Sequence, residues 1–313
     1  MAHPSRSAIA AGWHPGWVVH GQRPAAVTLR LPSPVVELVD GRLAAAGVRL
    51  LLKRDDLIHP ELPGNKWRKL KYNLTEAAAQ GHHTLLTFGG AYSNHIRATA
   101  AAGHFFGFST IGVVRGEEHL PLNPALAYAV GRGMRLTYLD RGAYRAKDDA
   151  RVIEALRDEW GPFYPIPEGG SNELAVRGCA ELPAEIADTF DVICCPVGTG
   201  GTLAGIASGL GPEQRAIGFS VLKGGEFLSG KVGQLQQLAL GYNSVNWHIE
   251  YDFHFGGYAR ATPQLKAFAA DFAARHALTL DHVYVAKMMF GIFALVESGT
   301  FAPGTTIVAV ITG

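Results

Sequence analysis

Short, continuously apolar segments alternate with alanine-rich segments along most of the chain, and this alternation restricts the fold more than any other feature. The apolar segments predict strands and the alanine-rich segments predict helices. Strands that are apolar at every position are typical of parallel sheets covered by helices on both faces, so the sequence predicts an α/β fold. The predicted strands are residues 84–88, 109–114, 135–139, 191–196, 216–222 and 306–311, and the predicted helices are residues 93–103, 123–132, 147–160, 172–189, 202–209, 263–276 and 286–299.

Charge and composition exclude several classes of protein. The 313 residues include 28 Lys and Arg and 27 Asp and Glu, a net charge of +1 that provides no basic surface for nucleic acid. No apolar run approaches the about 18 residues of a membrane-spanning helix. Three cysteines and 13 histidines without metal-binding spacing predict a cytoplasmic protein with no bound metal. Residues 1–26 lack the apolar segment of a signal peptide and are expected to form a loose N-terminal arm.

Paired glycines indicate where a ligand would bind. The chain has 38 glycines, and five Gly-Gly pairs occur, of which at least four follow predicted strands. The pairs begin at Gly89, Gly169, Gly200, Gly224 and Gly256. Ligands of open α/β sheets bind at the carboxyl ends of the strands. These loops are therefore the expected places for backbone to approach a ligand closely.

The lysine-rich segment Gly64 to Leu70 has two interpretations. On its own it is typical of a charged, solvated loop that enters a helix. Alternatively, its first two residues form a close-approach turn that presents Lys66 as a nucleophilic amine. A lysine forms a Schiff base when neighbouring cations or burial lower its pKa. Arg68 and Lys69 would supply such cations, or would hold an anion.

The segment Gly89 to His95 lies between a predicted strand and a predicted helix. Ser93 occupies the position of a helix N-cap, and capping is one interpretation of it. A Gly-Gly pair before a helix also leaves backbone N–H groups free to bind an anion such as a substrate carboxylate. Both interpretations remain open for Ser93.

The segment Val197 to Thr202 is the strongest isolated signal. Its glycines let the backbone approach a ligand closely, its threonines add hydroxyl donors, and the dipole of the following helix favours an anion. A tight turn alone would not need this many glycines and threonines together. The segment therefore predicts a phosphate cradle.

A second glycine-containing segment, Gly225 to Lys231, fits the first seven positions of a nucleotide-binding P-loop. The next residue is Val232, whereas the motif requires Ser or Thr as a magnesium ligand. We interpret this match as false.

Two tyrosines have a similar ambiguity. Tyr258 follows a Gly-Gly pair, and Tyr284 follows the segment Asp281 to Val283. Burial in an aromatic core is the default interpretation of both. Beside a cofactor, each phenol would instead act as an acid, a base or a hydrogen-bond donor to a leaving group.

A candidate amine, a carboxylate site and a phosphate cradle together match the needs of pyridoxal 5'-phosphate. At these residues the chain resembles the D-cysteine desulfhydrase / 1-aminocyclopropane-1-carboxylate deaminase family, which belongs to the fold type II, tryptophan-synthase-β-like pyridoxal-phosphate enzymes. The resemblance extends from about Leu31 to the C-terminus. Its most specific parts are Gly-Asn-Lys-x-Arg-Lys-Leu and Ser-Asn-His, and it is carried by residues 51–70, 89–98, 197–205 and 281–287.

The resemblance implies a role for each residue of the site. Lys66 would form the Schiff base with the cofactor and move the α-proton, Asn94 would bond the ring hydroxyl, and Thr312 would face the pyridine nitrogen. The implied catalytic residues are Lys66, Ser93, Tyr258 and Tyr284. The implied cofactor-binding residues are Lys66, Lys69, Asn94, Gly198, Thr199, Gly200, Gly201, Thr202 and Thr312, and the substrate-binding residues are Ser93, Asn94 and His95.

Two positions depart from the cyclopropane deaminases of this family. Val285 stands where those enzymes carry Glu, and His95 stands where they carry Gln. Both differences argue against opening of the cyclopropane ring. His95 matches the desulfhydrase branch, whereas Val285 differs from the Thr that is usual there.

With Thr312 as its partner in place of a carboxylate, the pyridine nitrogen would make the cofactor a modest electron sink. A modest electron sink suits β-elimination. The expected enzyme is a pyridoxal-phosphate-dependent carbon–sulfur lyase or deaminase that converts a small, D-cysteine-like amino acid to pyruvate, ammonia and sulfide. The alternatives on the same fold are a 1-aminocyclopropane-1-carboxylate deaminase and an amino-acid racemase or dehydratase. An alternative of a different class is a non-catalytic small-molecule sensor.

The expected architecture is two open parallel-sheet domains with the cofactor between them. Residues 27–69 and 171–313 would form the large cofactor-binding domain, and residues 70–170 would form a small inserted domain. The resemblance also implies a homodimer that acts on a small amino-acid substrate. The balanced charge and the lack of a long apolar run predict neither nucleic acid nor membrane as a partner.

Overall fold

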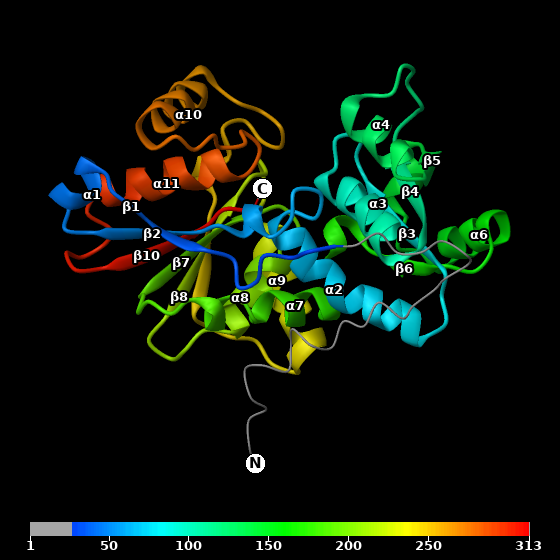
Figure 1. Cartoon of the computed structure of the whole chain (residues 1–313), viewed down its shortest axis with the longest axis horizontal. Helices are drawn as coiled ribbons and strands as arrows, with labels where there is room; N and C mark the ends of the chain where they lie inside the picture. Colours follow the sequence, from blue (N-terminus) through cyan, green and yellow to red (C-terminus); the bar gives the residue numbers. More distant parts are fainter. Residues whose placement is uncertain (1–26, 313) are drawn as a thin grey trace, which may run out of the picture.

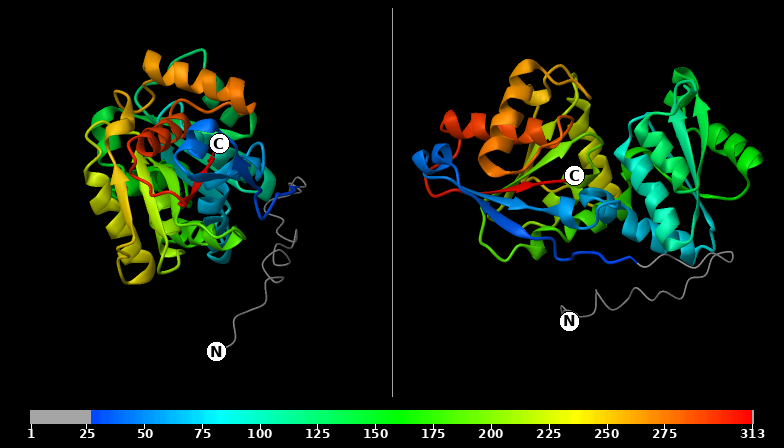
Figure 2. Two further views of the ribbon diagram at one scale, coloured as in Figure 1. Left: turned by 90° about the vertical axis from the view of Figure 1, so that its left-hand side faces the viewer. Right: turned by 45° about the horizontal axis from the view of Figure 1, so that its top comes forward.

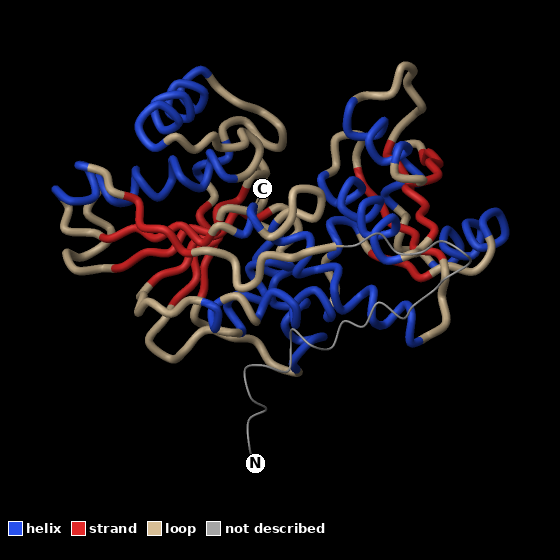
Figure 3. Tube along the Cα trace, viewed as in Figure 1, coloured by secondary structure: helices blue, strands red, loops and turns tan. Residues whose placement is uncertain are grey.

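Two separate β-sheets organise the protein, and helices enclose each of them (Figures 1 and 3). The structure, a computed structural model, describes residues 27–312, so the arm expected for residues 1–26 lies outside the described residues. Figure 2 shows the two groups of elements side by side, with the C-terminal end of the chain between them. Among the described residues, no helix is long and apolar enough to cross a membrane.

The larger sheet has six strands. They are β1 (Val35–Leu38), β2 (Arg49–Lys53), β7 (Val192–Val197), β8 (Arg215–Ser220), β9 (Trp247–Glu250) and β10 (Thr306–Val310), in the order β1-β2-β10-β7-β8-β9. All neighbours run parallel except β1 and β2. Only residues 39–48 separate β1 from β2, fewer than the about twelve or more that a parallel crossover needs. In this sheet the last strand of the chain, β10, lies between β2 and β7, whereas the first strand, β1, lies at one edge.

The smaller sheet has four parallel strands. They are β3 (Thr84–Gly89), β4 (Ser109–Arg115), β5 (Met134–Leu139) and β6 (Tyr164–Ile166), in the order β5-β4-β3-β6. With both sheets in place, the predicted α/β fold with parallel-strand sheets is confirmed.

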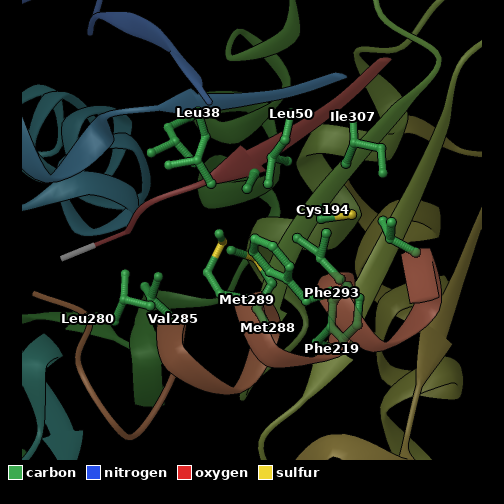
Figure 4. Close-up of a cluster of buried hydrophobic side chains, with 14 of the residues drawn as sticks. Leu38, Leu50, Cys194, Phe219, Leu280, Val285, Met288, Met289, Phe293 and Ile307 are labelled. Atoms are coloured by element: carbon green, nitrogen blue, oxygen red, sulfur yellow. The ribbon is translucent and has the colours of Figure 1, made fainter. Parts of the chain in front are cut away.

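Alternate residues of the large sheet point into two different cores, which explains why its strands are continuously apolar. On β10, Ile307 and Ala309 face one core, part of which Figure 4 shows, and Val308 and Val310 face the other. The first core is covered by α1 (Gly41–Ala45), α10 (Pro263–His276) and α11 (Val285–Glu297), and the second by α7 (Glu173–Ala180), α8 (Gly201–Ser208) and α9 (Phe227–Leu240).

Helices also cover both faces of the small sheet. The helices are α2 (Gly64–Ala79) and α3 (Asn94–Phe106) on one face, α5 (Arg141–Arg145) and α6 (Ala150–Trp160) on the other, and α4 (Pro124–Gly131) against α3. Helix α2 also packs against α7 beside the large sheet and so connects the two halves (Figure 1). Because α2 crosses the expected domain boundary between residues 69 and 70, the division into residues 27–69 with 171–313 and residues 70–170 stays a prediction.

All six predicted strands are present, but two predicted helices are shorter than expected. The segment 172–189 is helical only as α7 and as one 3-10 turn that begins at Pro183, because proline cannot donate the N–H that a continuing helix needs. In the segment 147–160 the helix begins at Ala150, where the Asp149 side chain accepts the N–H of Arg151. The sequence analysis does not identify β1, β2, β6 and β9, none of which exceeds five residues.

A pair of glycine substitutions tests the close packing of α2 on α7. A Cβ at Gly178, within α7, would lie 2.0 Å from the carbonyl oxygen of Arg68. We expect Gly178→Ala to lower the free energy of unfolding by about 2–3 kcal/mol, because overpacking forces the two helices apart. The matched control is Gly230 within α9, where a Cβ would meet no atom within 4 Å. Gly230→Ala should be neutral or stabilise by up to about 1 kcal/mol through helix propensity. Urea unfolding followed by circular dichroism measures both, and equal stability of the two variants would contradict the packing.

Candidate active site

A cavity of about 890 Å³ opens at the carboxyl ends of the strands, between the two sheets. All five Gly-Gly pairs follow a strand, and three of them, 89–90, 169–170 and 200–201, contribute a glycine to its lining. Every residue proposed for the site from the sequence lines the cavity except Arg68 and Gly201. Those residues are Lys66, Lys69, Ser93, Asn94, His95, Gly198, Thr199, Gly200, Thr202, Tyr258, Tyr284 and Thr312.

Lys66 lies in the first turn of α2, which begins at Gly64. Gly64 has φ +48°, and a Cβ there would lie 2.1 Å from the carbonyl oxygen of Thr312. Only glycine allows this approach, so the close-approach turn expected from the sequence is confirmed. The turn brings Lys66 to the same cavity as Thr312, which follows β10 and is buried.

The environment of Lys66 favours an uncharged amine. Burial, and then the positive charge of Lys69, lower the pKa of Lys66 to about 7. Its ammonium has no hydrogen-bond or ion-pair partner within residues 27–312. In a large fraction of the molecules the Lys66 amine is therefore uncharged, and so nucleophilic, at neutral pH.

Lys69 is fixed beneath the glycine-rich loops. Its Nζ donates to Ser171 Oγ at 3.0 Å and to the carbonyl oxygen of Gly169 at 3.1 Å, and lies 3.5 Å from Thr199 Oγ1. Burial lowers the pKa of Lys69. The ammonium therefore joins the loop after β6 to the loop after β7 and faces the cavity, as expected for a cation that assists Lys66 or holds an anion.

Arg68 neither assists Lys66 nor holds an anion in the cavity, so the role expected for it from the sequence is wrong. Its guanidinium bonds Asp55 through Nε at 2.6 Å and Glu185 through Nη1 at 2.7 Å. Arg68 is 1 % exposed and does not line the cavity. The buried Asp55 and the partly buried Glu185 already neutralise its charge. The sequence does not indicate the contact with Glu185, because Glu185 lies more than a hundred residues away.

The loop from Gly198 to Thr202 connects β7 to α8 and carries unused donors. Gly200 adopts left-handed backbone with φ +83°, and no side chain caps the helix. The N–H groups of Gly200, Gly201 and Thr202 have no acceptor among the described residues. Free N–H groups at a helix N-terminus bind anions, so the loop has the donors of a phosphate cradle.

Gly201 differs from its neighbours because a Cβ there would lie 2.6 Å from Ser171 Oγ. This glycine packs against the start of α7 and does not face the cavity. Its proposed part in the cradle can therefore come only from its N–H.

The start of α3 is a second candidate anion site. Ser93 Oγ accepts the N–H of Ile96 at 3.3 Å, so its capping role is confirmed, and Ser93 also lines the cavity. The N–H groups of Asn94 and His95 have no acceptor in the part of the chain that the structure describes. A Cβ at Gly89 would lie 2.7 Å from Ser93 Oγ, so glycine is needed before this turn.

His95 presents two unpaired nitrogens to the cavity. The side chain is 2 % exposed, and neither ring nitrogen has a hydrogen-bond partner among residues 27–312. Burial and the charges of Lys66 and Lys69 hold its pKa well below the ordinary value, so the imidazole is neutral. A buried polar group without a partner is costly, and a ligand in the cavity would satisfy it.

Tyr258 and Tyr284 form a pair at the cavity wall, and Tyr284 also packs against the apolar core of the large sheet. Tyr284 Oη donates to Tyr258 Oη at 3.3 Å, and the rings meet edge to face. Burial, and then the neighbouring Tyr258, raise the pKa of Tyr284 well above its ordinary value. Tyr284 therefore keeps its proton at neutral pH and can donate a hydrogen bond.

Two residues without a role in the sequence analysis position these tyrosines. The carboxylate of Asp281 accepts the N–H of Tyr284 at 2.7 Å. Lys287 is fully buried, and its Nζ donates at 2.7 Å to the carbonyl oxygen of Gly257, directly before Tyr258. The available sequence signal for Lys287 is a lysine within an otherwise apolar helical segment.

The P-loop match is false in the structure as well. Helix α9 begins at Phe227, and the N–H of Leu228 already bonds the carbonyl oxygen of Gly225 at 2.9 Å. The segment thus forms a helical turn and leaves no phosphate loop. Residues 27–312 also contain no group of three or more His, Cys, Asp and Glu side chains that could hold a metal ion.

The arrangement fits pyridoxal phosphate. That group needs a reactive amine, donors for its phosphate and an anchor for the substrate carboxylate. Lys66 would supply the amine, and the Gly198–Thr202 loop and Lys69 would supply phosphate donors. The free N–H groups at the start of α3 would supply the carboxylate anchor, and the unpaired nitrogens of His95 face the same space.

The chain is similar in sequence and in fold to proteins of one enzyme family. A family described as "Pyridoxal-phosphate dependent enzyme" matches residues 28–313. A protein of Pyrococcus furiosus named "Putative 1-aminocyclopropane-1-carboxylate deaminase" is 32% identical over 274 residues, which cover 81% of each chain. A D-cysteine desulfhydrase of Yersinia pestis is 31% identical over 290 residues, which cover 85% of this chain and 87% of that protein. The crystal structure of an "ACC deaminase homologue" superposes with a TM-score of 0.81 at 30% identity and covers 93% of this chain and 91% of that one.

The coupling of Lys66 to Lys69 predicts a shift in pH dependence. An amine attacks an aldehyde only when uncharged, so the rate of covalent attachment should rise with pH through the pKa of Lys66, about 7. Lys69→Met removes the neighbouring charge and should move this midpoint to higher pH. The measurement uses the apoprotein and pyridoxal, whose lack of a phosphate removes the direct effect of Lys69 on phosphate binding. Lys266→Met, on the exposed face of α10, is the control, and an unchanged midpoint in Lys69→Met would contradict the coupling.

Proposed function

Because the chain belongs to the fold type II pyridoxal-phosphate-dependent enzymes, in the D-cysteine desulfhydrase / 1-aminocyclopropane-1-carboxylate deaminase family, we propose that it is a lyase. The proposed reaction is α,β-elimination on a small, D-cysteine-like amino acid to pyruvate, ammonia and sulfide. The observation that carries the proposal is Lys66, an unpaired amine with a pKa of about 7 between a phosphate cradle and a carboxylate site.

The cavity residues divide into those that hold the cofactor and those that hold the substrate. Lys66 would bond the cofactor, the Gly198–Thr202 loop with Lys69 would bind its phosphate, and Asn94 and Thr312 would contact its ring. The start of α3 would bind the substrate carboxylate through its free N–H groups and Ser93. When bound, pyridoxal phosphate withdraws electrons from the α-carbon and makes the α-proton acidic.

The proton acceptor and the hydrogen-bond donor follow from the two perturbed pKa values. Lys66 Nζ, uncharged near neutral pH, would accept the α-proton. Tyr284 Oη, which keeps its proton because burial raises its pKa, would donate a hydrogen bond to the leaving sulfur, with Tyr258 as its hydrogen-bond partner. Asp281 and Lys287 would keep both phenols in place.

The residue after Tyr284 supports elimination over ring opening. Val285 is 2 % exposed, packs in the core of the large sheet and does not line the cavity. The carboxylate that cyclopropane deaminases of this family carry at that position therefore has no counterpart there.

The names of several relatives favour a second candidate, deamination of 1-aminocyclopropane-1-carboxylate. Racemisation or dehydration of a related amino acid is the remaining alternative on this fold, and a non-catalytic sensor is the alternative of a different class. The products distinguish all four.

We also propose that the enzyme works in the cytoplasm as a homodimer, with a small inserted domain of residues 70–170. Free, buried Cys179, Cys194 and Cys195 support a reducing compartment. The family resemblance supports the dimer, and the separate four-stranded sheet supports the small domain.

Removal of the proposed nucleophile should abolish the reaction. We expect Lys66→Ala to lose both the absorbance of covalently bonded cofactor and all measurable lyase activity, because the variant lacks the amine that would bond the cofactor. Lys266→Ala, at an exposed site on α10, should retain both. Retention of the bonded-cofactor absorbance by Lys66→Ala would show that another lysine holds the cofactor.

A substrate panel tests the proposed reaction itself. The purified holoenzyme is incubated with D- and L-cysteine, D- and L-serine and 1-aminocyclopropane-1-carboxylate, and sulfide, pyruvate, ammonia and enantiomeric composition are measured. The proposal predicts equal amounts of sulfide and pyruvate from one enantiomer of cysteine. Ammonia from the cyclopropane without turnover of cysteine would support the second candidate, inversion without pyruvate would support a racemase, and no turnover would support a sensor.

A further inference from the structure

Five cationic side chains line the cavity, more than the proposed roles use. They are Lys66, Lys69, Arg115, Lys147 and Lys231, and the carboxylates that line the same space are Asp148 and Glu168. The cofactor accounts for Lys66 and Lys69. The remaining three lie in different parts of the wall and have different partners.

Two of the three have an evident local explanation. Lys147 lies 3.4 Å from a carboxylate oxygen of Glu168 and 3.5 Å from one of Asp148, so its charge is largely neutralised. Lys231 belongs to α9, whose Val232 packs over Gly200, where a Cβ would approach it to 3.0 Å. Lys231 therefore lies on the phosphate side of the cavity.

Arg115 is the cation without an explanation. It ends β4, and its guanidinium lies over the ring of Tyr144, 5.7 Å from the centroid. Within residues 27–312 it has no hydrogen bond to another side chain and no ion pair. Its side chain is exposed and points to the cavity, so its charge is available to a ligand.

The position of Arg115 relates it to the proposed carboxylate site. A Cβ at Gly90 would lie 3.6 Å from Nη2 of Arg115, so the guanidinium lies beside the turn that leads to Ser93. Strand β4 pairs with β3 as far as Val114 and Gly89, and adjacent strands lie about 4.8 Å apart. A substrate whose α-carboxylate is bound at the start of α3 would thus extend its side chain within reach of Arg115.

We propose that Arg115 binds a second acidic group on the substrate, and that the substrates are cysteine S-conjugates whose leaving thiol carries a carboxylate. Guanidinium is the side chain best matched to a carboxylate because it donates two parallel hydrogen bonds. The inference rests on the proposed function and deepens it, because it names the substrate class. For S-carboxymethylcysteine, the carbon–sulfur bond breaks with its electron pair on sulfur. The α-proton goes to Lys66 and sulfur gains a proton, so that with one water the products are thioglycolate, pyruvate and ammonia.

The first experiment compares two substrates of equal size that differ in charge. S-carboxymethylcysteine and S-carbamoylmethylcysteine, each as the D and the L enantiomer, are given to the holoenzyme and pyruvate is measured. We expect kcat/KM to favour the acid about tenfold or more, as one charge-assisted hydrogen-bonded pair allows. In Arg115→Gln this ratio should fall about tenfold, and Arg115→Lys should recover part of it.

The matched control is Arg135, which lies on β5 of the same sheet, stacks on the ring of Trp160 at 4.8 Å and does not line the cavity. Arg135→Gln should keep the wild-type ratio. Equal loss of both substrates in Arg115→Gln would assign Arg115 to the α-carboxylate and overturn the proposal, as would a wild-type enzyme that does not distinguish acid from amide.

The second experiment does not depend on elimination. Isothermal titration calorimetry of the holoenzyme with glutamate and glutamine measures the preference for a side-chain carboxylate directly. We expect tighter binding of glutamate in the wild type and loss of this preference in Arg115→Gln. If neither cysteine conjugate is turned over but the Arg115-dependent preference for glutamate is present, the proposed reaction is wrong while the acid-binding role of Arg115 stands. Without that preference, the role of Arg115 is overturned as well.

Discussion

The buried contact of Arg68 with Asp55 and Glu185 is the constraint from which the site follows. Asp55 comes directly after β2 and Glu185 lies between α7 and β7, so the guanidinium joins α2 to two different parts of the large-sheet layer. Lys53 completes the network at 2.7 Å from Glu185, whose pKa is lowered to about 2, mainly by its hydrogen bond to Arg68 against the opposing effect of burial. Removal of one partner from such a buried network typically costs about 3–5 kcal/mol. Lys66, two residues before Arg68, therefore has little freedom to move.

The same helical turn gives its three cations three different environments. Arg68 is neutralised by carboxylates, Lys69 is bonded to a hydroxyl and a backbone carbonyl, and Lys66 has no partner in the described chain. Only Lys66 is thus left as a reactive amine, because burial, and then the charge of Lys69, lower its pKa to about 7. In the same cavity, burial raises the pKa of Tyr284 and keeps it protonated. A proton acceptor and a hydrogen-bond donor therefore coexist in one cavity at neutral pH, because their environments move their pKa values in opposite directions.

Features that depend on neighbouring residues could be read from the sequence. The cap at Ser93, the turn at Gly64 and the loop at Gly200 are each determined by a few adjacent residues, and each is present. Features that depend on distant contacts could not. Nothing near Arg68 in the sequence indicates Glu185, and nothing near Tyr258 indicates that Lys287 holds its loop. The short strands β1, β2, β6 and β9 were also not identified, because so few residues do not establish a pattern.

The proposed covalent bond between Lys66 and the cofactor can be tested directly. Reduction of the holoenzyme with borohydride fixes that bond, and proteolysis followed by mass spectrometry locates it. We expect one modified peptide, with the mass of a reduced pyridoxyl phosphate on Lys66. The same modification on Lys69, Lys231 or Lys287, with Lys66 unmodified, would contradict it.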